Sequence, residues 1–294
     1  MRSRNTSDKI KLSLKGILMG IAEALPGISG GTIALLVGIY KELIMSISEI
    51  DISLYSELKN KGFKSFWKKL NGNFFLFLSF GTVIGLFFSV NVLASLLENY
   101  PLFIWSFFLG LVFATVYVIR KLINQWRIIN FFYLFASIIF SLILSSFSIY
   151  ESDEISLLFV LFSGIIASSA MILPGISGSL LLLILGVHAY IIKSINNILN
   201  LSYENIELIL ILVFISGALI GLLVFSRIVK YLFINYRDIT YTVMLGLVIG
   251  SIEKVWPWNK SFSAELSNLN LLLSISLAVL GFMIVFLLEK NKKY

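Results

Sequence analysis

The sequence contains no cysteine among its 294 residues, only one histidine and four prolines, and only 13% of the residues are charged. The absence of cysteine excludes disulfide bonds, thiolate chemistry and cysteine-ligated metals. No spacing of the remaining residues matches a metal-ligand set, a P-loop or a nucleotide-binding fingerprint, so we predict neither a metal nor a cofactor. A charged share this low is well below that of a soluble domain.

Hydrophobic residues instead make up 58% of the chain, and the mean hydropathy is +0.95. Such a composition predicts an integral membrane protein, because a soluble core does not need this much apolar surface. The net charge of +7 comes from short basic clusters between apolar runs, not from one basic face, so we predict no nucleic-acid partner. The first 15 residues resemble the start of a signal peptide, but no small-residue cleavage site follows, and we expect the segment to be retained.

Six apolar runs are long enough to cross a bilayer, which takes about 20 residues of helix. Two further apolar tracts, residues 14–47 and 157–195, are too long for one crossing and are interrupted in the middle. We interpret each as a re-entrant helix pair that enters the membrane and returns to the same side. The six predicted spans are residues 73–97, 102–121, 130–149, 207–226, 239–256 and 269–288.

The two interruptions have nearly the same sequence. Residues 25–31 read Leu-Pro-Gly-Ile-Ser-Gly-Gly, and residues 173–179 read Leu-Pro-Gly-Ile-Ser-Gly-Ser. Pro26 and Pro174 break their helices at membrane depth, where no water is present to satisfy the freed backbone groups. Such breaks persist only where they are buried in protein or line a cavity, so two matching breaks predict a binding site.

The distribution of lysine and arginine predicts the orientation, because these residues collect on cytoplasmic loops. If each broken tract returns to its own side, both termini and the basic segments 59–69, 120–127 and 227–237 are cytoplasmic. Only Lys254 and Lys260 then lie on the other side.

The same arrangement predicts an all-α fold built from two inverted repeats. Residues 1–154 and residues 155–294 each contain one re-entrant pair and three transmembrane helices, and an odd number of crossings places the second copy upside down. Glycines support the alignment: Gly16 matches Gly164, Gly38 matches Gly186, and Gly81 and Gly85 match Gly217 and Gly221. Inverted repeats with broken helices are typical of secondary transporters.

A helix that begins just after Pro-Gly presents free N–H groups and the positive end of its dipole, which favours phosphate. Glycines allow close approach, and hydroxyls add further hydrogen-bond donors. The alternative is that the serines are simple N-caps and the glycines allow helix packing. The predicted phosphate-binding residues are Gly27, Ile28, Ser29, Gly30, Gly31 and Thr32 in the first tract and Gly175, Ile176, Ser177, Gly178 and Ser179 in the second.

Glu23 is the acidic residue placed deep in an apolar tract, three residues before Pro26. An acid at membrane depth is a functional candidate, and we expect Glu23 to couple protons or to contact the headgroup; capping of a broken helix is the alternative. Its counterpart in the second half is Met171. The single histidine, His188, matches Tyr40 and is predicted near a helix end.

Together, Glu23 and the two Leu-Pro-Gly-Ile-Ser-Gly tracts resemble the PopT-type polyprenyl-phosphate transporters, over nearly the whole chain. The resemblance implies a protein of the bacterial plasma membrane that returns undecaprenyl phosphate, a lipid carrier of cell-wall precursors, from the outer to the inner leaflet. Membrane lipid and this carrier are then its expected partners. The family motifs fall on Glu23, residues 26–32 and residues 174–179.

Two other functions remain as alternatives. Membrane undecaprenyl-diphosphate phosphatases also use inverted broken helices, but they require a cation for phosphoryl transfer, and Gly178 stands where their arginine follows the motif serine. We therefore predict that the protein is not an enzyme. A channel or transporter for a small anion is the second alternative.

Overall fold

A computed structural model describes residues 4–23, 29–147, 156–258 and 267–290 of the chain. The described residues form helices and connections without a β-strand. The first half comprises α1 (Thr6–Glu23), α2 (Gly30–Leu36), α3 (Tyr40–Ser48), α4 (Ser53–Lys69), α5 (Gly72–Phe88), a π-helical turn (Ser89–Leu93), α6 (Ala94–Asn99), α7 (Pro101–Leu122) and α8 (Ile128–Ser146). The second half comprises α9 (Leu157–Ile172), α10 (Gly178–Ile184), α11 (His188–Leu199), α12 (Asn205–Asn235), α13 (Arg237–Gly250), a 3-10 turn (Ser251–Val255) and α14 (Asn268–Lys290).

Four of the described helices, α7, α8, α12 and α14, are individually long and apolar enough to cross a membrane. Three bent pairs reach that length only together: α2 with α3, α4 with α5, and α10 with α11. The predicted multi-pass membrane architecture is therefore supported. Two predicted spans are composite, because residues 73–97 contain α5, the π-helical turn and α6, and residues 239–256 contain α13 and the 3-10 turn.

In each tract one helix ends before the Pro-Gly pair and the next begins after it, as predicted, but the sharp bend lies twelve residues beyond the proline, where none was predicted. The axes of α2 and α3 differ by 119°, and those of α10 and α11 by 108°. Gly38 and Gly186, which the repeat alignment pairs, lie at these two bends, and both have a φ of +73°. Because a positive φ costs other residues about 1–2 kcal/mol, glycine is the residue that allows each sharp turn.

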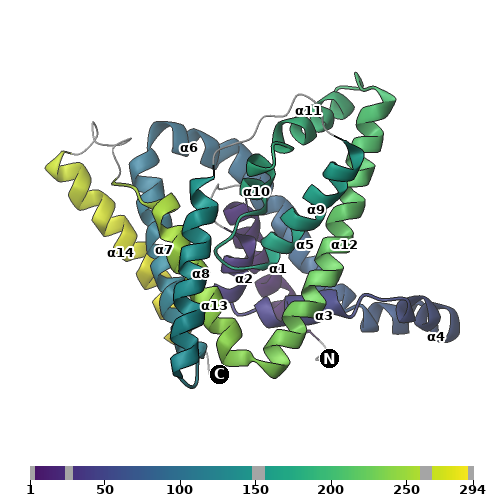
Figure 1. The fold of residues 1–294 in the computed structure, drawn as a ribbon, viewed down its shortest axis with the longest axis horizontal. Helices are drawn as coiled ribbons and strands as arrows, with labels where there is room; N and C mark the ends of the chain where they lie inside the picture. Colours follow the sequence, from purple (N-terminus) through teal and green to yellow (C-terminus); the bar gives the residue numbers. More distant parts are fainter. Residues whose placement is uncertain (1–3, 24–28, 148–155, 259–266, 291–294) are drawn as a thin grey trace.

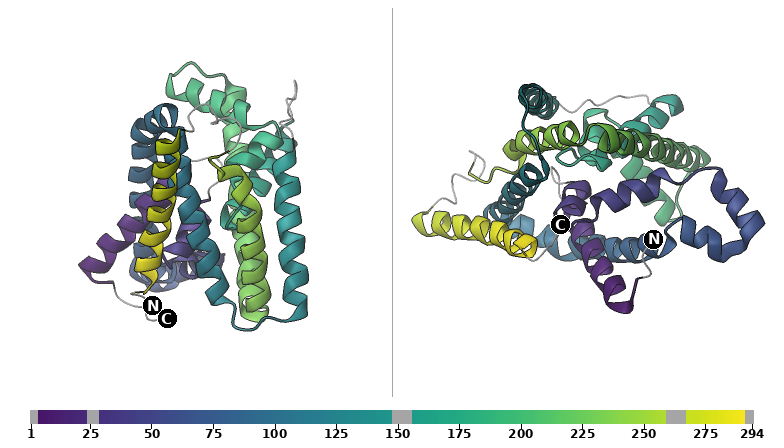
Figure 2. Two further views of the ribbon diagram at one scale, coloured as in Figure 1. Left: turned by 90° about the vertical axis from the view of Figure 1, so that its left-hand side faces the viewer. Right: turned by 90° about the horizontal axis from the view of Figure 1, so that it is seen from below.

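The ribbon views place the connections at two opposite ends of the helix bundle. In Figure 1, α4, the connection between α7 and α8, and the corner between α12 and α13 lie in the lower part, whereas α6 and α11 lie at the top. Both α12 and α14 run downward to the end that carries α4 (Figures 1 and 2). The basic segments 59–69, 120–127 and 227–237 therefore gather at one end of the molecule, as the orientation rule requires of loops on one side.

Helix packing repeats between the two halves. Within the first half α1 packs along α5, and within the second half α9 packs along α12. Backbones approach closely at glycines that the alignment pairs: Gly16 and Gly81 lie at the first contact, and Gly164 and Gly217 at the second. The remaining large contacts join the halves, because α7 packs along α14 and α8 along α13. Small residues at such seams are typical of helix packing in membranes.

The Lys-rich segment between the first broken tract and the first span was treated as a loop in the sequence analysis, but most of it is helical. It forms α4, which projects from the side of the bundle (Figures 1 and 2). Gly62 interrupts α4 with a φ of +78°, so the segment is two short helices joined at a kink. Because α4 is rich in polar residues, apolar runs in the sequence do not reveal it as a helix.

Candidate functional site

The described part of the first motif is the start of α2. Pro26, Gly27 and Ile28 lie outside the described residues, and Ser29 is the N-cap residue. The Ser29 hydroxyl accepts a hydrogen bond from Gly31 N–H at 3.1 Å, and the Ser29 carbonyl accepts one from Thr32 N–H at 2.9 Å. These bonds satisfy two of the N–H groups that a helix start leaves open.

Glu23, the last residue of α1, satisfies the remaining N–H group at this end. Its Oε2 accepts a hydrogen bond from Gly30 N–H at 2.7 Å. A carboxylate at a helix N-terminus is stabilised by the free amides and by the helix dipole. Glu23 is therefore at the predicted site, and it occupies there the position that an anion would take.

The second motif is described throughout, and it begins α10 without a comparable cap. Gly175 has a φ of +89°, and its Cα hydrogen faces α13 so closely that a Cβ would lie 2.6 Å from Val248 N. Ser177 precedes α10 but its side chain caps no amide. Instead the hydroxyls of Ser177 and Ser179 lie 2.7 Å apart and share one hydrogen bond.

The two motifs, which are about half a chain apart in sequence, meet in the folded protein. Gly175 N–H donates a hydrogen bond to Thr32 Oγ1 at 3.0 Å. The Ser29 hydroxyl donates to the carbonyl of Met171 at 3.3 Å, and the buried Tyr40 hydroxyl donates to the carbonyl of Ile172 at 2.9 Å. The starts of α2 and α10 and the end of α9 therefore form one continuous site.

The environments of the two helix starts differ. All seven residues of α2 are buried, whereas Gly178 is the buried residue of α10. The N–H groups of Gly178, Ser179 and Leu180 donate no hydrogen bond to any residue in the described ranges. Of the two helix starts, it is thus α10 that carries unused donors, together with the hydroxyls of Ser177 and Ser179.

This arrangement is suited to an anion with several acceptor oxygens. Adjacent N–H groups at a helix start, with hydroxyls beside them, match a phosphate group. Ile176 is buried against Leu247 and Ala170 and supports the turn, and Pro174 is also buried. His188 begins α11, beyond the second bend, and lies outside this cluster of contacts.

Sequence reasoning did not find every contributor to the site. Tyr40 was noted only as the counterpart of His188, although its hydroxyl joins α3 to the end of α9. Met171 was noted only as the counterpart of Glu23, yet its carbonyl accepts the Ser29 hydroxyl and its side chain packs beside Gly178. The alignment of the two halves, which pairs Tyr40 with His188 and Met171 with Glu23, is the sequence feature that could have identified both residues.

Comparison with known proteins agrees with the architecture and the motifs. Residues 19–271 match the family model described as undecaprenyl phosphate translocase-like. A protein of Vibrio cholerae named polyprenyl-phosphate transporter is 38% identical over 267 residues, which cover 90% of this chain and 82% of that protein. A Staphylococcus aureus protein with the same name is 28% identical over 255 residues, covering 83% of this chain and 85% of that protein. No solved structure matches the chain.

These matches confirm the family predicted from the motifs, and with it the interpretation of the chain as a transporter and not an enzyme. The matched range includes Glu23 and both Leu-Pro-Gly-Ile-Ser-Gly tracts. The chain belongs to the undecaprenyl phosphate translocase-like family of membrane transporters.

Proposed function

We propose that this protein carries a polyprenyl phosphate, with undecaprenyl phosphate as the substrate, from the outer to the inner leaflet of the bacterial plasma membrane. The names of the Vibrio cholerae and Staphylococcus aureus relatives support the class of substrate. The observation that carries the proposal is the contact of the two motifs through Thr32 and Gly175, next to unused donors at the start of α10.

In this proposal the phosphate headgroup binds between the two motifs, while the polyprenyl chain stays in lipid beside the protein. The N–H groups of Gly178 and Ser179 and the hydroxyls of Ser177 and Ser179 donate to the phosphate oxygens. Residues 29–32 of the first motif form the opposite wall, and Thr32 and Ser29 bond to the second motif. A headgroup site of this kind needs no water-filled pore for the lipid chain.

Glu23 gives the site a means of coupling transport to protons. Its carboxylate accepts a hydrogen bond from Gly30 N–H at 2.7 Å. Protonation weakens this bond and removes a negative charge next to the arriving phosphate, so a proton and the headgroup bind together more favourably than either alone. We propose that the proton then crosses with the lipid.

The two halves, residues 1–154 and 155–294, act as inverted repeats that rock against each other and expose the site to one leaflet at a time. The repeated packing of α1 on α5 and of α9 on α12 supports the repeat, and the placement of the counterparts α3 and α11 at opposite ends in Figure 1 supports the inversion. The basic end of the bundle faces the cytoplasm, together with both termini.

Reconstitution in vesicles tests the function and the site together. We expect the wild-type protein to expose polyprenyl phosphate from the inner leaflet to an outside phosphate reagent, and Thr32→Val to slow this about tenfold, because leaving the part-buried Gly175 N–H without its partner costs about 1–3 kcal/mol. Thr32→Ser retains the hydroxyl and serves as the matched control. Glu23→Gln keeps the shape of the side chain and should abolish the dependence of transport on a pH gradient.

Two results would count against the proposal. Unchanged lipid movement in both Thr32→Val and Glu23→Gln would remove the motifs from the mechanism. Uptake of inorganic phosphate without any movement of lipid would favour the small-anion transporter instead.

A further inference from the structure

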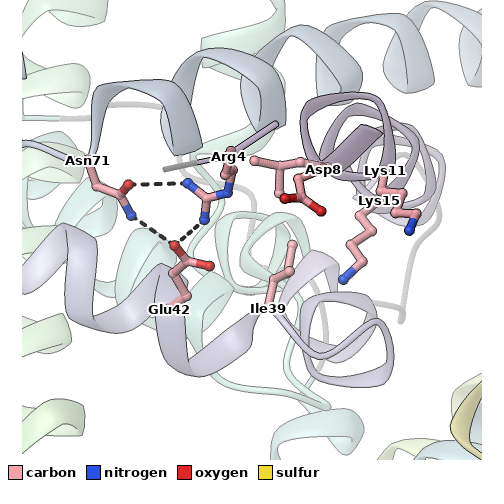
Figure 3. Close-up of a pocket in the computed structure, with 8 residues that line it drawn as sticks. Arg4, Asp8, Lys11, Lys15, Ile39, Glu42 and Asn71 are labelled. Atoms are coloured by element: carbon pink, nitrogen blue, oxygen red, sulfur yellow. Dashed lines mark hydrogen bonds and ion pairs between the residues drawn. The ribbon is translucent and has the colours of Figure 1, made fainter. Parts of the chain in front are cut away.

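A cavity of about 400 Å³ lies at the start of α1, away from the paired motifs. Its lining residues come from the N-terminal segment, α1, the bend between α2 and α3, α3, and the residue before α5 (Figure 3). The volume is within the range of small-ligand sites. The residues that line it are Arg4, Asp8, Lys11, Leu12, Lys15, Ile39, Glu42 and Asn71.

One side of the cavity is a saturated polar network. Arg4 forms an ion pair with Glu42, and its other amino group donates to Asn71 Oδ1 at 3.3 Å. Asn71 Nδ2 also donates to Glu42 Oε1 at 3.0 Å and to the Ser46 hydroxyl at 2.9 Å. Glu42 is thus paired with Arg4, and the network holds α3 against the start of α5.

The opposite side carries two lysines, and the charge of Glu42 also acts on Lys15. Lys11 and Lys15 are one turn apart on α1, and Figure 3 shows both on the side of the cavity away from Glu42. Neither ammonium forms a hydrogen bond or an ion pair with another residue of the described segments. Asp8 accepts a backbone N–H from Asn5 at 3.4 Å and also lines the cavity, so one carboxylate lies on the same side as the two lysines.

The cavity and the paired motifs are connected along one face of α1. Lys15, Met19 and Glu23 follow one another at intervals of four residues, which places them on the same side of the helix. Lys15 precedes Glu23 by eight residues, or about 12 Å of helix. Ile39, at the cavity wall, directly precedes α3, so the cavity also adjoins the bent pair that contains the first motif.

We infer that this cavity is a second phosphate subsite, which binds a phosphate monoester through Lys11 and Lys15 at the end of the bundle that carries the basic segments. The inference rests on the proposed function for the identity of its ligand, the headgroup of the transported lipid. Two unpaired ammonium groups complement the charge of a phosphate monoester, and Arg4 is held beside them by Glu42. The headgroup passes between this subsite and the paired motifs along α1.

Binding to the full-length protein in lipid nanodiscs tests this subsite. The probes are farnesyl phosphate, farnesol and inorganic phosphate, measured by calorimetry. We expect Lys15→Gln to weaken farnesyl phosphate binding about tenfold, because a charge-assisted bond is lost, and to leave farnesol binding unchanged. Lys15→Arg should restore the affinity, and Lys41→Gln, an exposed lysine next to Glu42 that does not line the cavity, should bind like the wild type.

The probes also identify the source of the phosphate. If Lys15→Gln weakens the binding of farnesyl phosphate but not of inorganic phosphate, the result supports a lipid headgroup as the ligand. If it weakens the binding of both equally, the result supports a subsite for phosphate from solution. Wild-type affinity of Lys15→Gln and of the Lys11→Gln/Lys15→Gln double variant for both probes would overturn the inference. Equal competition by phosphatidylglycerol would also overturn it, since it would indicate attraction of any anionic lipid.

Transport separates this inference from the proposed function. If the wild-type protein moves polyprenyl phosphate and Thr32→Val does not, while Lys15→Gln binds and transports normally, the subsite is wrong and the function stands. If the wild-type protein moves no polyprenyl phosphate, the proposed function is wrong, and the calorimetry still decides whether the cavity binds phosphate.

Discussion

The starts of α2 and α10 have almost the same sequence, but their N–H groups have different partners. At α2 the Gly30 N–H is bonded to Glu23, and Ser29 caps the next two amides. At α10 the equivalent neighbour of Gly178 is Met171, whose side chain offers no such acceptor, and the Ser177 hydroxyl bonds to the Ser179 hydroxyl and caps no amide of the described residues. The difference shows that the first motif has its helix start capped by neighbouring groups, whereas the second leaves donors open within the described residues.

The largest effect is expected from giving the start of α10 the acidic neighbour that the start of α2 has. Met171→Glu places a carboxylate beside Gly178, where it competes with phosphate for the open amides. We expect polyprenyl-phosphate transport to fall more than about tenfold, which is the effect of losing a charge-assisted bond. Vesicle transport assays measure this, with Met171→Leu as the apolar control. Normal transport by Met171→Glu would show that the donors of α10 are not used.

Backbone conformation at the second motif provides the next test. Gly175 combines a positive φ with a close approach to α13, whereas Gly62 has a positive φ with open space around it. We expect Gly175→Ala to lower the stability of the protein by about 3 kcal/mol and Gly62→Ala by about 1 kcal/mol. Thermal unfolding in detergent compares the two variants. Equal destabilisation would mean that the contact with Val248 contributes nothing beyond the φ angle.

The smallest expected effects are those of replacing the motif serines Ser29 and Ser177 by alanine. Ser29→Ala removes a helix cap and the bond to Met171, so we expect a loss of about 1 kcal/mol in stability. Ser177→Ala removes no cap, so its stability should stay within about 0.5 kcal/mol of the wild type while phosphate affinity falls about fivefold. Melting curves with and without farnesyl phosphate measure both quantities. The opposite pattern, with Ser177 as the stabilising residue, would reverse the roles assigned to the two helix starts.

Much of this arrangement follows from the sequence because it depends on local patterns. Apolar length located the long helices α7, α8, α12 and α14, and the repeat alignment paired Gly38 with Gly186, which adopt the same φ at the two sharp bends. The partners of α7 and α8 could not be predicted, since helices of similar hydropathy do not reveal which neighbour they pack against. The unequal capping of α2 and α10 was also missed, because the two motifs differ little and the contacts that distinguish them come from α1 and α9.

The small-residue seams limit which parts of the protein are free to move. At Gly81 and Gly85 the backbone of α5 lies against that of α1, and at Gly217 and Gly221 the backbone of α12 lies against that of α9. Backbones in such close contact cannot slide past each other without a clash, so each of these helix pairs travels as a single lever. We therefore expect movement at the bends at Gly38 and Gly186, which follow α2 and α10 and so adjoin the proposed phosphate site.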